Sequence, residues 1–169
     1  IPVYIFDEMA PVSLLSFAVK RLGASLGLMI TASHNSREYN GYKVYSSDGY
    51  QITDEASEAI LAECQQLDTF EDVSYMEFED ALKWSICTYI EDSICEEFIE
   101  SILALRLTDI SGSNIRVVYT PLYGAGFKYV KTVLEKAGLK NLYIVENQIE
   151  HNGAVSYTHL RAHETLRYL

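Results

Sequence analysis

The sequence predicts an α/β protein with mixed sheets flanked by helices, and three observations support this fold class. One predicted helix follows Pro11 and has an apolar face that extends to Leu22, and a second predicted helix extends over 127–137. Gly23 and Gly138 follow them directly, as glycine commonly does at helix ends. Each helix is flanked by two apolar runs of strand length, at 3–6, 26–30, 115–119 and 142–145. This order predicts two β-α-β units with parallel strands and right-handed crossovers.

The first unit begins with the strand at 3–6 and continues into a helix that starts after Pro11. The apolar face of this helix is expected to comprise Leu14, Leu15, Phe17, Ala18, Val19 and Leu22. The next strand, 26–30, is an apolar run, which predicts a short buried strand. Whatever follows its carboxyl end would lie where open α/β sheets bind their ligands.

A hairpin is predicted after this unit, because turn residues at 47–49 separate the strand-like stretches 42–45 and 50–52. Thr53 has the side chain of a helix N-cap, and the two acidic residues after it suit the positive end of a helix. We expect this helix to run to about residue 67.

Residues 68–80 carry six acidic side chains. Paired carboxylates can bind a metal ion, but no Asp-x-Asp spacing gathers several of them on one cation. We therefore predict a solvated connector. A further helix is predicted beyond it by apolar residues at helical spacing, which we expect to form a core face. They are Ile90, Ile94, Phe98, Ile102 and Leu105.

Length, charge and cysteine content narrow the class of protein. The chain has 169 residues, of which 49% are hydrophobic, enough for one domain or parts of two. Its net charge of −11 argues against nucleic acid as a partner, since phosphate binding depends on Lys and Arg. No apolar run reaches the roughly 18 residues of a membrane span, and residues 1–4 form no signal peptide, so we expect a cytoplasmic chain that begins in mid-protein. Cys64, Cys87 and Cys95 form no C-x-x-C pair and indicate free thiols in a reducing compartment.

The stretch 31–41 is dense in hydroxyl, imidazole, amide and charged groups. Ser33 is its natural centre, His34 follows directly, and Lys43 lies on the strand that leaves the loop. A polar loop held between two strands is a common place for catalytic residues, although Asn40-Gly41 is also an ordinary turn signal. A serine hydrolase is disfavoured, because there is no Gly-x-Ser-x-Gly elbow and adjacent Ser and His side chains seldom point at each other.

Two other patterns suggest ligand sites but are incomplete. Gly124 and Gly126 lie between a predicted strand and a predicted helix, as in dinucleotide-binding turns. The third glycine and a well-placed acidic residue are absent, so a nucleotide site is disfavoured. His159 and His163 are four residues apart, which can place two metal ligands on one helix face, but the sequence supplies no third ligand nearby.

Two stretches together resemble one protein family. Thr-Ala-Ser-His-Asn at 31–35, followed by Tyr-Asn-Gly-Tyr-Lys-Val-Tyr at 39–45, resembles the active-serine loop of the α-D-phosphohexomutases, the phosphoglucomutase and phosphomannomutase family. Tyr-Thr-Pro-Leu-x-Gly-x-Gly at 119–126 resembles the opening of that family's second domain, about 90 residues later and in the family's order. The chain departs from the family at Ser36, where Pro is usual, and at Tyr123, where His is usual. The resemblance extends over roughly residues 1–148.

The resemblance implies a mutase that interconverts hexose 1-phosphate and hexose 6-phosphate through a phosphoserine and a bisphosphate intermediate. Ser33, His34 and Lys43 are the expected catalytic and substrate-binding residues. Ser33 would carry the phosphoryl group, Lys43 the proton, and His34 would contact the substrate. The family's Mg²⁺ would be bound through the phosphate on Ser33 and by three aspartates that this chain lacks, and a hexose 1,6-bisphosphate would act as activator. Asn35 and Asn40 would maintain the shape of the loop.

The resemblance also predicts the domain organisation. Residues 1–88 would be the C-terminal part of phosphohexomutase domain 1, and residues 89–150 the start of domain 2. Residues 151–169 depart from the family and are interpreted as a non-native tail.

Glucose is the expected hexose, because 6–8 and 41–49 resemble bacterial phosphoglucomutases. A phosphomannomutase is the alternative, because in the family a loop of the third domain distinguishes glucose from mannose, and this chain does not include that loop. A non-catalytic binding protein that keeps the fold is the other alternative, against which the presence of Ser33, His34 and Lys43 argues. The chain lacks the metal ligands and the sugar clamp, and its acidic balance does not attract an anionic substrate. We therefore expect residues 1–169 alone to be inactive.

Overall fold

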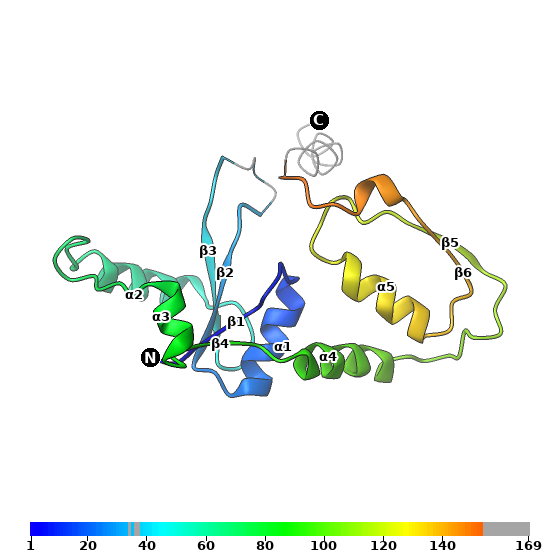
Figure 1. Ribbon diagram of the computed structural model, residues 1–169, viewed down its shortest axis with the longest axis horizontal. Coiled ribbons are helices and arrows are strands. Elements are labelled where there is room, and N and C mark those ends of the chain that lie inside the picture. The colour runs from blue at the N-terminus through cyan, green and yellow to red at the C-terminus, as the bar shows by residue number, and fades with distance from the viewer. Residues whose placement is uncertain (34, 36–37, 154–169) are drawn as a thin grey trace.

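In the computed structural model, which describes residues 1–33, 35 and 38–153, the strands pair two by two (Figure 1). β1 (Val3–Ile5) runs parallel to β4 (Cys87–Tyr89), β2 (Leu26–Ile30) antiparallel to β3 (Tyr42–Ser46), and β5 (Arg116–Tyr119) parallel to β6 (Asn141–Ile144). Parallel and antiparallel pairs therefore occur in one α/β chain, which confirms the predicted fold class.

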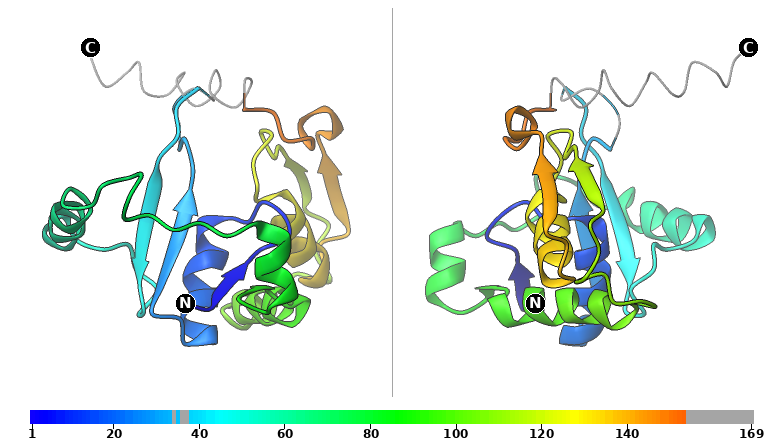
Figure 2. Two further views of the ribbon diagram at one scale, coloured as in Figure 1. Left: turned by 60° about the vertical axis from the view of Figure 1, so that its left-hand side comes forward. Right: turned by 90° about the vertical axis from the view of Figure 1, so that its right-hand side faces the viewer.

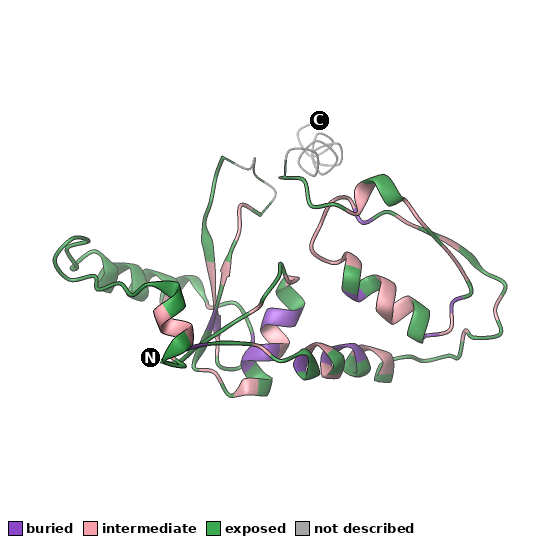
Figure 3. Ribbon diagram, viewed as in Figure 1, coloured by how far each residue is buried: buried purple, intermediate pink, exposed green. Residues whose placement is uncertain are grey.

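The helices are α1 (Val12–Leu22), α2 (Asp54–Cys64), α3 (Phe78–Lys83), α4 (Asp92–Ala104) and α5 (Phe127–Lys136), with a 3₁₀ turn η1 (Glu146–Gln148). α1 packs on the β2–β3 hairpin, α5 lies beside β5 and β6, and α4 contacts both helices (Figure 2). α2 projects away from the hairpin and has no buried residue (Figure 3). No helix in the described part of the chain has the length and apolarity to cross a membrane.

The helix ends follow the local signals. α1 is closed by Gly23 at φ 62°, and α5 is followed by Gly138 at φ 91°, both in the region where a side chain is strained. Thr53 caps α2, because its Oγ1 accepts a hydrogen bond from the amide of Ala56 at 3.3 Å. The helix predicted after Pro11, the helix predicted at 127–137 and the predicted cap are thus confirmed.

The predicted hairpin after β3 is a tight reversal with little strand beyond it. The Ser46 amide donates to the carbonyl of Tyr50 at 2.9 Å, and the Ile52 amide donates to that of Val44 at 3.0 Å. Gly49 has φ 82°, and an added Cβ would lie 2.7 Å from the Ser16 carbonyl oxygen of α1. The turn therefore requires glycine for its conformation and for its close approach to α1.

The second predicted β-α-β unit is confirmed, since β5 and β6 pair in parallel on either side of α5. The first predicted β-α-β unit has the expected order of strand, helix and strand, but the prediction that its two strands pair with each other is wrong. β1 bonds to β4, with Val3↔Cys87 in register, and β2 bonds to β3, with Gly27↔Tyr45 in register. The partner of β1 lies more than eighty residues along the chain, and no local pattern encodes that contact.

The expectation that β2 is a buried strand is also wrong for one of its two faces. Leu26, Leu28 and Ile30 are between 52% and 65% exposed, because α1 covers only the opposite face. On the covered face lies Gly27, where an added Cβ would be 2.5 Å from Cγ2 of Val19. The helix rests directly on the strand at this glycine.

Three segments between the two units differ from the sequence interpretation. α2 ends at Cys64, about one turn before the predicted end. The acidic connector is exposed over 68–79, but α3 begins within it at Phe78. β4 was not predicted, and the proposed domain boundary at 88 and 89 falls inside it.

The core helix predicted from the stripe at 90–105 is α4. Ile94 and Phe98 are buried, Ile102 is half-buried, and Leu105 lies beyond the helix and is 78% exposed. Leu14, Phe98, Ile99 and Tyr129 form one core cluster, which joins α1, α4 and α5. A smaller cluster of Leu15, Val19 and Tyr45 attaches α1 to the hairpin. The three cysteines are free, with Cys87 buried and Cys64 exposed.

Candidate active-serine site

The candidate site lies on the loop that joins β2 to β3, at the end of the hairpin farthest from α4 (Figures 1 and 2). The backbone pairing continues one step past the strands, because the Thr31 amide donates to the Gly41 carbonyl at 2.8 Å. Thr31 and Gly41 are therefore the bases of the loop, and the hairpin holds them opposite each other. The segment that follows η1 lies at the same end of the molecule.

Ser33 is an exposed residue with a left-handed backbone, φ 56°. Its amide donates to Oγ1 of Thr31 at 2.9 Å. A non-glycine residue at positive φ is uncommon and often marks a site where the surrounding structure imposes the conformation. The sequence prediction places the reacting hydroxyl at this residue.

Lys43, the second predicted site residue, is half-buried in β3 and pairs with Met29 of β2. By strand alternation it shares a face of the hairpin with Gly27 and Tyr45, the face on which α1 packs. Ser33 thus lies in the loop of the hairpin, and Lys43 lies on the strand that leaves this loop. The structure brings these two predicted residues to one region of the molecule.

His34, the third predicted residue, lies outside the described residues. Asn35 and Asn40, which were expected to maintain the loop, make short-range backbone contacts. The Asn35 amide donates to the Ala32 carbonyl at 3.0 Å, and the Asn40 side-chain oxygen accepts from the Gly41 amide at 3.0 Å. The Asn35 bond closes a turn around Ser33, whereas the Asn40 contact joins neighbouring residues.

A second turn with left-handed residues follows β5. Leu122 and Tyr123 have φ 51° and 62°, and the Gly124 amide donates to the Pro121 carbonyl at 3.0 Å, as in a type I′ turn. The Tyr123 amide donates to the Gln148 carbonyl at 2.9 Å, which ties the turn to η1. Nearby, burial raises the pKa of the Tyr119 phenol. Sequence reasoning placed a Gly-rich turn here but not its unusual backbone.

A cavity of about 280 Å³ with both charged and apolar lining residues lies between the segment after β1 and the start of α5. Glu8 and Lys128 line it and form an ion pair with both side chains about half exposed. The hydrogen bond that the Lys128 amine donates to Glu8 raises the pKa of that amine. His151 also lines this cavity. No local pattern signals the contact of Glu8 with Lys128, which joins residues 120 positions apart.

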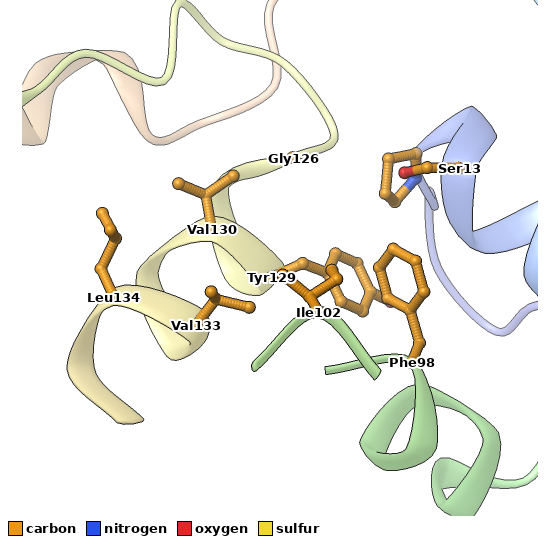
Figure 4. A pocket seen from close by; sticks show the side chains of 9 residues that line it. Ser13, Phe98, Ile102, Gly126, Tyr129, Val130, Val133 and Leu134 are labelled. Atoms are coloured by element: carbon orange, nitrogen blue, oxygen red, sulfur yellow. The ribbon is translucent and has the colours of Figure 1, made fainter. Parts of the chain in front are cut away.

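A second, apolar cavity of about 200 Å³ lies where α1, α4 and α5 meet (Figure 4). Phe98, Ile102 and Tyr129 gather at its centre, and Val133 borders it on α5. Among the described residues no charged side chain lines it, so it does not offer the groups that a phosphorylated sugar would need. It is therefore not the candidate site.

The described residues do not fit a magnesium site by themselves. Within 1–33, 35 and 38–153, no group of three His, Cys, Asp or Glu side chains could hold a metal ion. Ser33 would supply a single oxygen, whereas Mg²⁺ binds several. The pair His159 and His163 lies outside the described residues.

Comparison with known proteins agrees with the two stretches on which the resemblance depends. The sequence profile of phosphoglucomutase/phosphomannomutase α/β/α domain I matches residues 1–71, and that of domain II matches residues 96–168. The chain belongs to the phosphoglucomutase/phosphomannomutase family. The domain II match extends into residues 151–169, whose interpretation as a non-native tail stays a prediction, as does the division at 88 and 89.

Relatives in this family include the phosphoglucomutase of Staphylococcus haemolyticus (strain JCSC1435), which is 34% identical over 150 residues and 89% of this chain. The phosphoglucomutase of Staphylococcus aureus (strain MRSA252) is 32% identical over 149 residues and 86% of this chain. These matches cover 27% and 26% of the two relatives, so the chain spans about a quarter of their length.

A solved structure with the same fold is that of a Thermus thermophilus protein assigned as a phosphomannomutase. It superposes with a TM-score of 0.70 at 27% identity and covers 92% of this chain, which in turn covers 32% of that protein. The arrangement of both units is thus found in a longer family member.

Proposed function

We propose that the protein to which this chain belongs is a phosphohexomutase in which Ser33 accepts and returns the phosphoryl group. The observation that carries the proposal is the placement of Ser33 at φ 56° on an exposed loop whose returning strand bears Lys43. Membership of the phosphoglucomutase/phosphomannomutase family and the relatives named phosphoglucomutase support it.

The proposed reaction begins with attack by Oγ of Ser33 on a phosphorus of a hexose 1,6-bisphosphate. The new Oγ–P bond forms as the P–O bond to the sugar breaks, and the Ser33 hydroxyl proton passes to the departing sugar oxygen. Lys43 is proposed to carry that proton from Oγ to the sugar oxygen. Phosphorylated Ser33 then donates its phosphoryl group to the free hydroxyl of a hexose 1-phosphate, and the proton of that hydroxyl returns through Lys43. The resulting hexose 1,6-bisphosphate turns around, and its other phosphoryl group returns to Ser33 as the hexose 6-phosphate leaves. His34 is proposed to contact the substrate.

Other parts of the proposal concern the whole protein. Mg²⁺ would neutralise charge on the transferring group when bound by ligands beyond the described residues, and the bisphosphate would serve as activator. The proposed location is the cytoplasm. The proposed organisation is domain 1 at 1–88 and the start of domain 2 at 89–150, with a non-native tail at 151–169.

Uptake of a phosphoryl group tests the function directly. The full-length protein, incubated with glucose 1,6-bisphosphate and Mg²⁺, should gain one phosphoryl group by intact mass, and peptide mapping should place it on Ser33. A Ser33→Ala variant should gain none. Stoichiometric sugar binding by a wild-type protein that is never phosphorylated would instead favour a non-catalytic binding protein.

We propose glucose as the hexose, supported by the staphylococcal relatives, whereas the Thermus structure keeps mannose as the alternative. Rates of the full-length protein with glucose 1-phosphate and mannose 1-phosphate decide between them. Residues 1–169 alone are expected to show no turnover with either sugar. Aligning reactants can contribute ~7–11 kcal/mol of barrier lowering, and the sugar clamp expected to align them is not among these residues. Turnover by this piece that disappears in Ser33→Ala would contradict that expectation.

A further inference from the structure

Thr31 links the paired part of the hairpin to the unusual backbone of Ser33. Its amide is fixed by the Gly41 carbonyl at 2.8 Å, on the opposite arm of the loop. Its hydroxyl oxygen accepts the Ser33 amide at 2.9 Å, which is the i to i+2 pattern of a Ser/Thr turn. Thr31 therefore connects Ser33 to a point whose position the strands determine.

The strand register also places Thr31 on the same face of the hairpin as Lys43. Met29 pairs with Lys43, and Thr31, two residues farther, lies opposite Gly41. Because side chains alternate along a strand, Thr31 falls on the same face of the hairpin as Met29 and Lys43. Gly41 leaves space at this step, since a Cβ there would meet only the Thr31 carbonyl oxygen, at 3.6 Å, among the described atoms.

We propose that Thr31 is a positioning residue, whose hydroxyl holds the Ser33 backbone in the left-handed conformation and so sets the direction in which the Ser33 hydroxyl leaves the chain. The backbone angles of Ser33 fix the direction of its Cα–Cβ bond, and a change of φ from positive to negative would turn the hydroxyl away from its present course. Thr31 touches no reacting atom in this role. The expected effect on kcat rests on the proposed function of Ser33. The expected effect on the backbone conformation of Ser33 does not.

The test compares Thr31→Val with Thr31→Ser in the full-length protein. Valine keeps the shape of threonine without the acceptor oxygen, and serine keeps the oxygen without the methyl group. Thr31→Val should lower kcat by ~10²-fold, the size expected for a misplacement of about 1 Å, with a small change in KM. Thr31→Ser should retain near wild-type kcat.

A matched control separates positioning from folding. Thr53 also accepts a backbone amide through its hydroxyl, from Ala56 at 3.3 Å, but it caps α2 away from the loop. Thr53→Val should lower the thermal midpoint and leave kcat unchanged, whereas Thr31→Val should lower kcat at a nearly unchanged midpoint. If Thr31→Val fails to fold, Thr31→Asn replaces it as a rescue test, since the Asn side-chain oxygen can accept the same i+2 amide and should preserve kcat.

A second readout is independent of mutase activity. The one-bond Cα–Hα coupling of Ser33 depends on the sign of φ and should change in Thr31→Val but not in Thr31→Ser. An active Thr31→Val with wild-type kcat, or a Thr31→Asn that folds without activity, would overturn the inference and leave the proposed function intact. An inactive wild-type protein would refute the proposed function, and the coupling would then decide on Thr31: an unchanged value in Thr31→Val overturns the inference, and a changed value supports it.

Discussion

The loop after β2 and the turn after β5 both hold non-glycine residues at positive φ, and they do so by different means. In the first, a main-chain bond from the Asn35 amide to the Ala32 carbonyl spans Ser33, and the side-chain oxygen of Thr31 also accepts the amide of Ser33. In the second, main-chain carbonyls of Pro121 and Gln148 accept the amides that surround Leu122 and Tyr123. The first turn therefore adds a contact that requires a particular side chain, whereas the bonds named for the second come from the main chain.

The secondary structure that carries each turn also differs, in whether neighbouring or distant segments hold it. β5 and β6 form a parallel pair with α5 between them in sequence, so this unit is defined by nearby segments. The hairpin that carries Ser33 is seated by α1 at Gly27, while β1 is paired with the distant β4. The contact of α1 with Gly27 thus holds the hairpin that carries Ser33, and left-handed non-glycine residues of this kind cluster at functional sites.

The largest expected effect separates the two turns by function. Ser33→Ala should reduce kcat of the full-length protein by on the order of 10⁶-fold, as removal of a nucleophile does in covalent enzymes. Tyr123→Asn, at the other left-handed turn, should leave kcat close to wild type, because Asn tolerates this backbone and the turn is held by main-chain bonds. Steady-state rates of both variants check this. Comparable losses in both would show that the turn after β5 belongs to the catalytic machinery.

The next effect tests the packing beneath the Ser33 loop. Gly27→Ala should lower the free energy of unfolding by ~1–3 kcal/mol, because the new methyl group would lie 2.5 Å from Cγ2 of Val19 and α1 must shift. Gly112→Ala, whose methyl group would meet no described atom within 4 Å in the loop before β5, is the matched control and should change stability little. Urea denaturation measures both. Equal stability of the two variants would mean that α1 does not seat the hairpin at Gly27.

Much of the local structure was predictable because its signals span a few residues. Gly23, Gly138 and Thr53 act on the helices beside them, and the turn at 47–49 acts on its own flanks. The pairing of β1 with β4 was not predictable, since it depends on a contact between residues 3 and 87 that neither segment encodes alone. The exposure of Leu26 and Leu28 was missed because an apolar run does not reveal whether one face or both are covered.

The candidate site shows the same division. The sequence predicted Ser33 in a polar loop between two strands and Lys43 on the second of these strands, but not that the two strands pair as one hairpin. The sequence shows a hydroxyl residue, Thr31, two positions before Ser33. The role proposed for Thr31 could be inferred only from the hydrogen bond and the backbone angle of Ser33 in the structure. The contact of Glu8 with Lys128 has no local pattern at all.

A smaller effect, seen at alkaline pH, tests how the second unit is held to α4. Tyr129 of α5 is buried against Phe98, with Cys95 Sγ 3.9 Å from its hydroxyl, and burial raises the pKa of its phenol. The unfolded chain loses this proton near pH ~10 while the folded protein retains it, so stability should fall as the pH rises above that value. Tyr129→Phe should flatten this fall in urea titrations, and Tyr143→Phe, at an exposed position of β6, should not. A wild-type slope in Tyr129→Phe would place the alkaline sensitivity elsewhere.

The smallest expected effect returns to the two turns and asks what their strain is for. A left-handed non-glycine residue costs roughly 1–2 kcal/mol, which Gly and, in part, Asn avoid. Replacing Leu122 by Asn and Tyr123 by Gly supplies the preferred pair for two successive positive φ angles and should stabilise the protein by about 1 kcal/mol. Because main-chain bonds hold this turn, activity should be retained.

Ser33→Gly is the matched change in the other turn. It should give a similar gain in the free energy of unfolding while removing the hydroxyl and abolishing phosphoryl uptake. Denaturation and phosphorylation of the two variants thus test whether the left-handed backbone serves only the fold, as expected at Leu122 and Tyr123, or presents a reacting group, as expected at Ser33. If the paired substitution at Leu122 and Tyr123 destabilised the protein, side-chain contacts rather than main-chain bonds would hold the second turn, and the contrast between the two turns would fail.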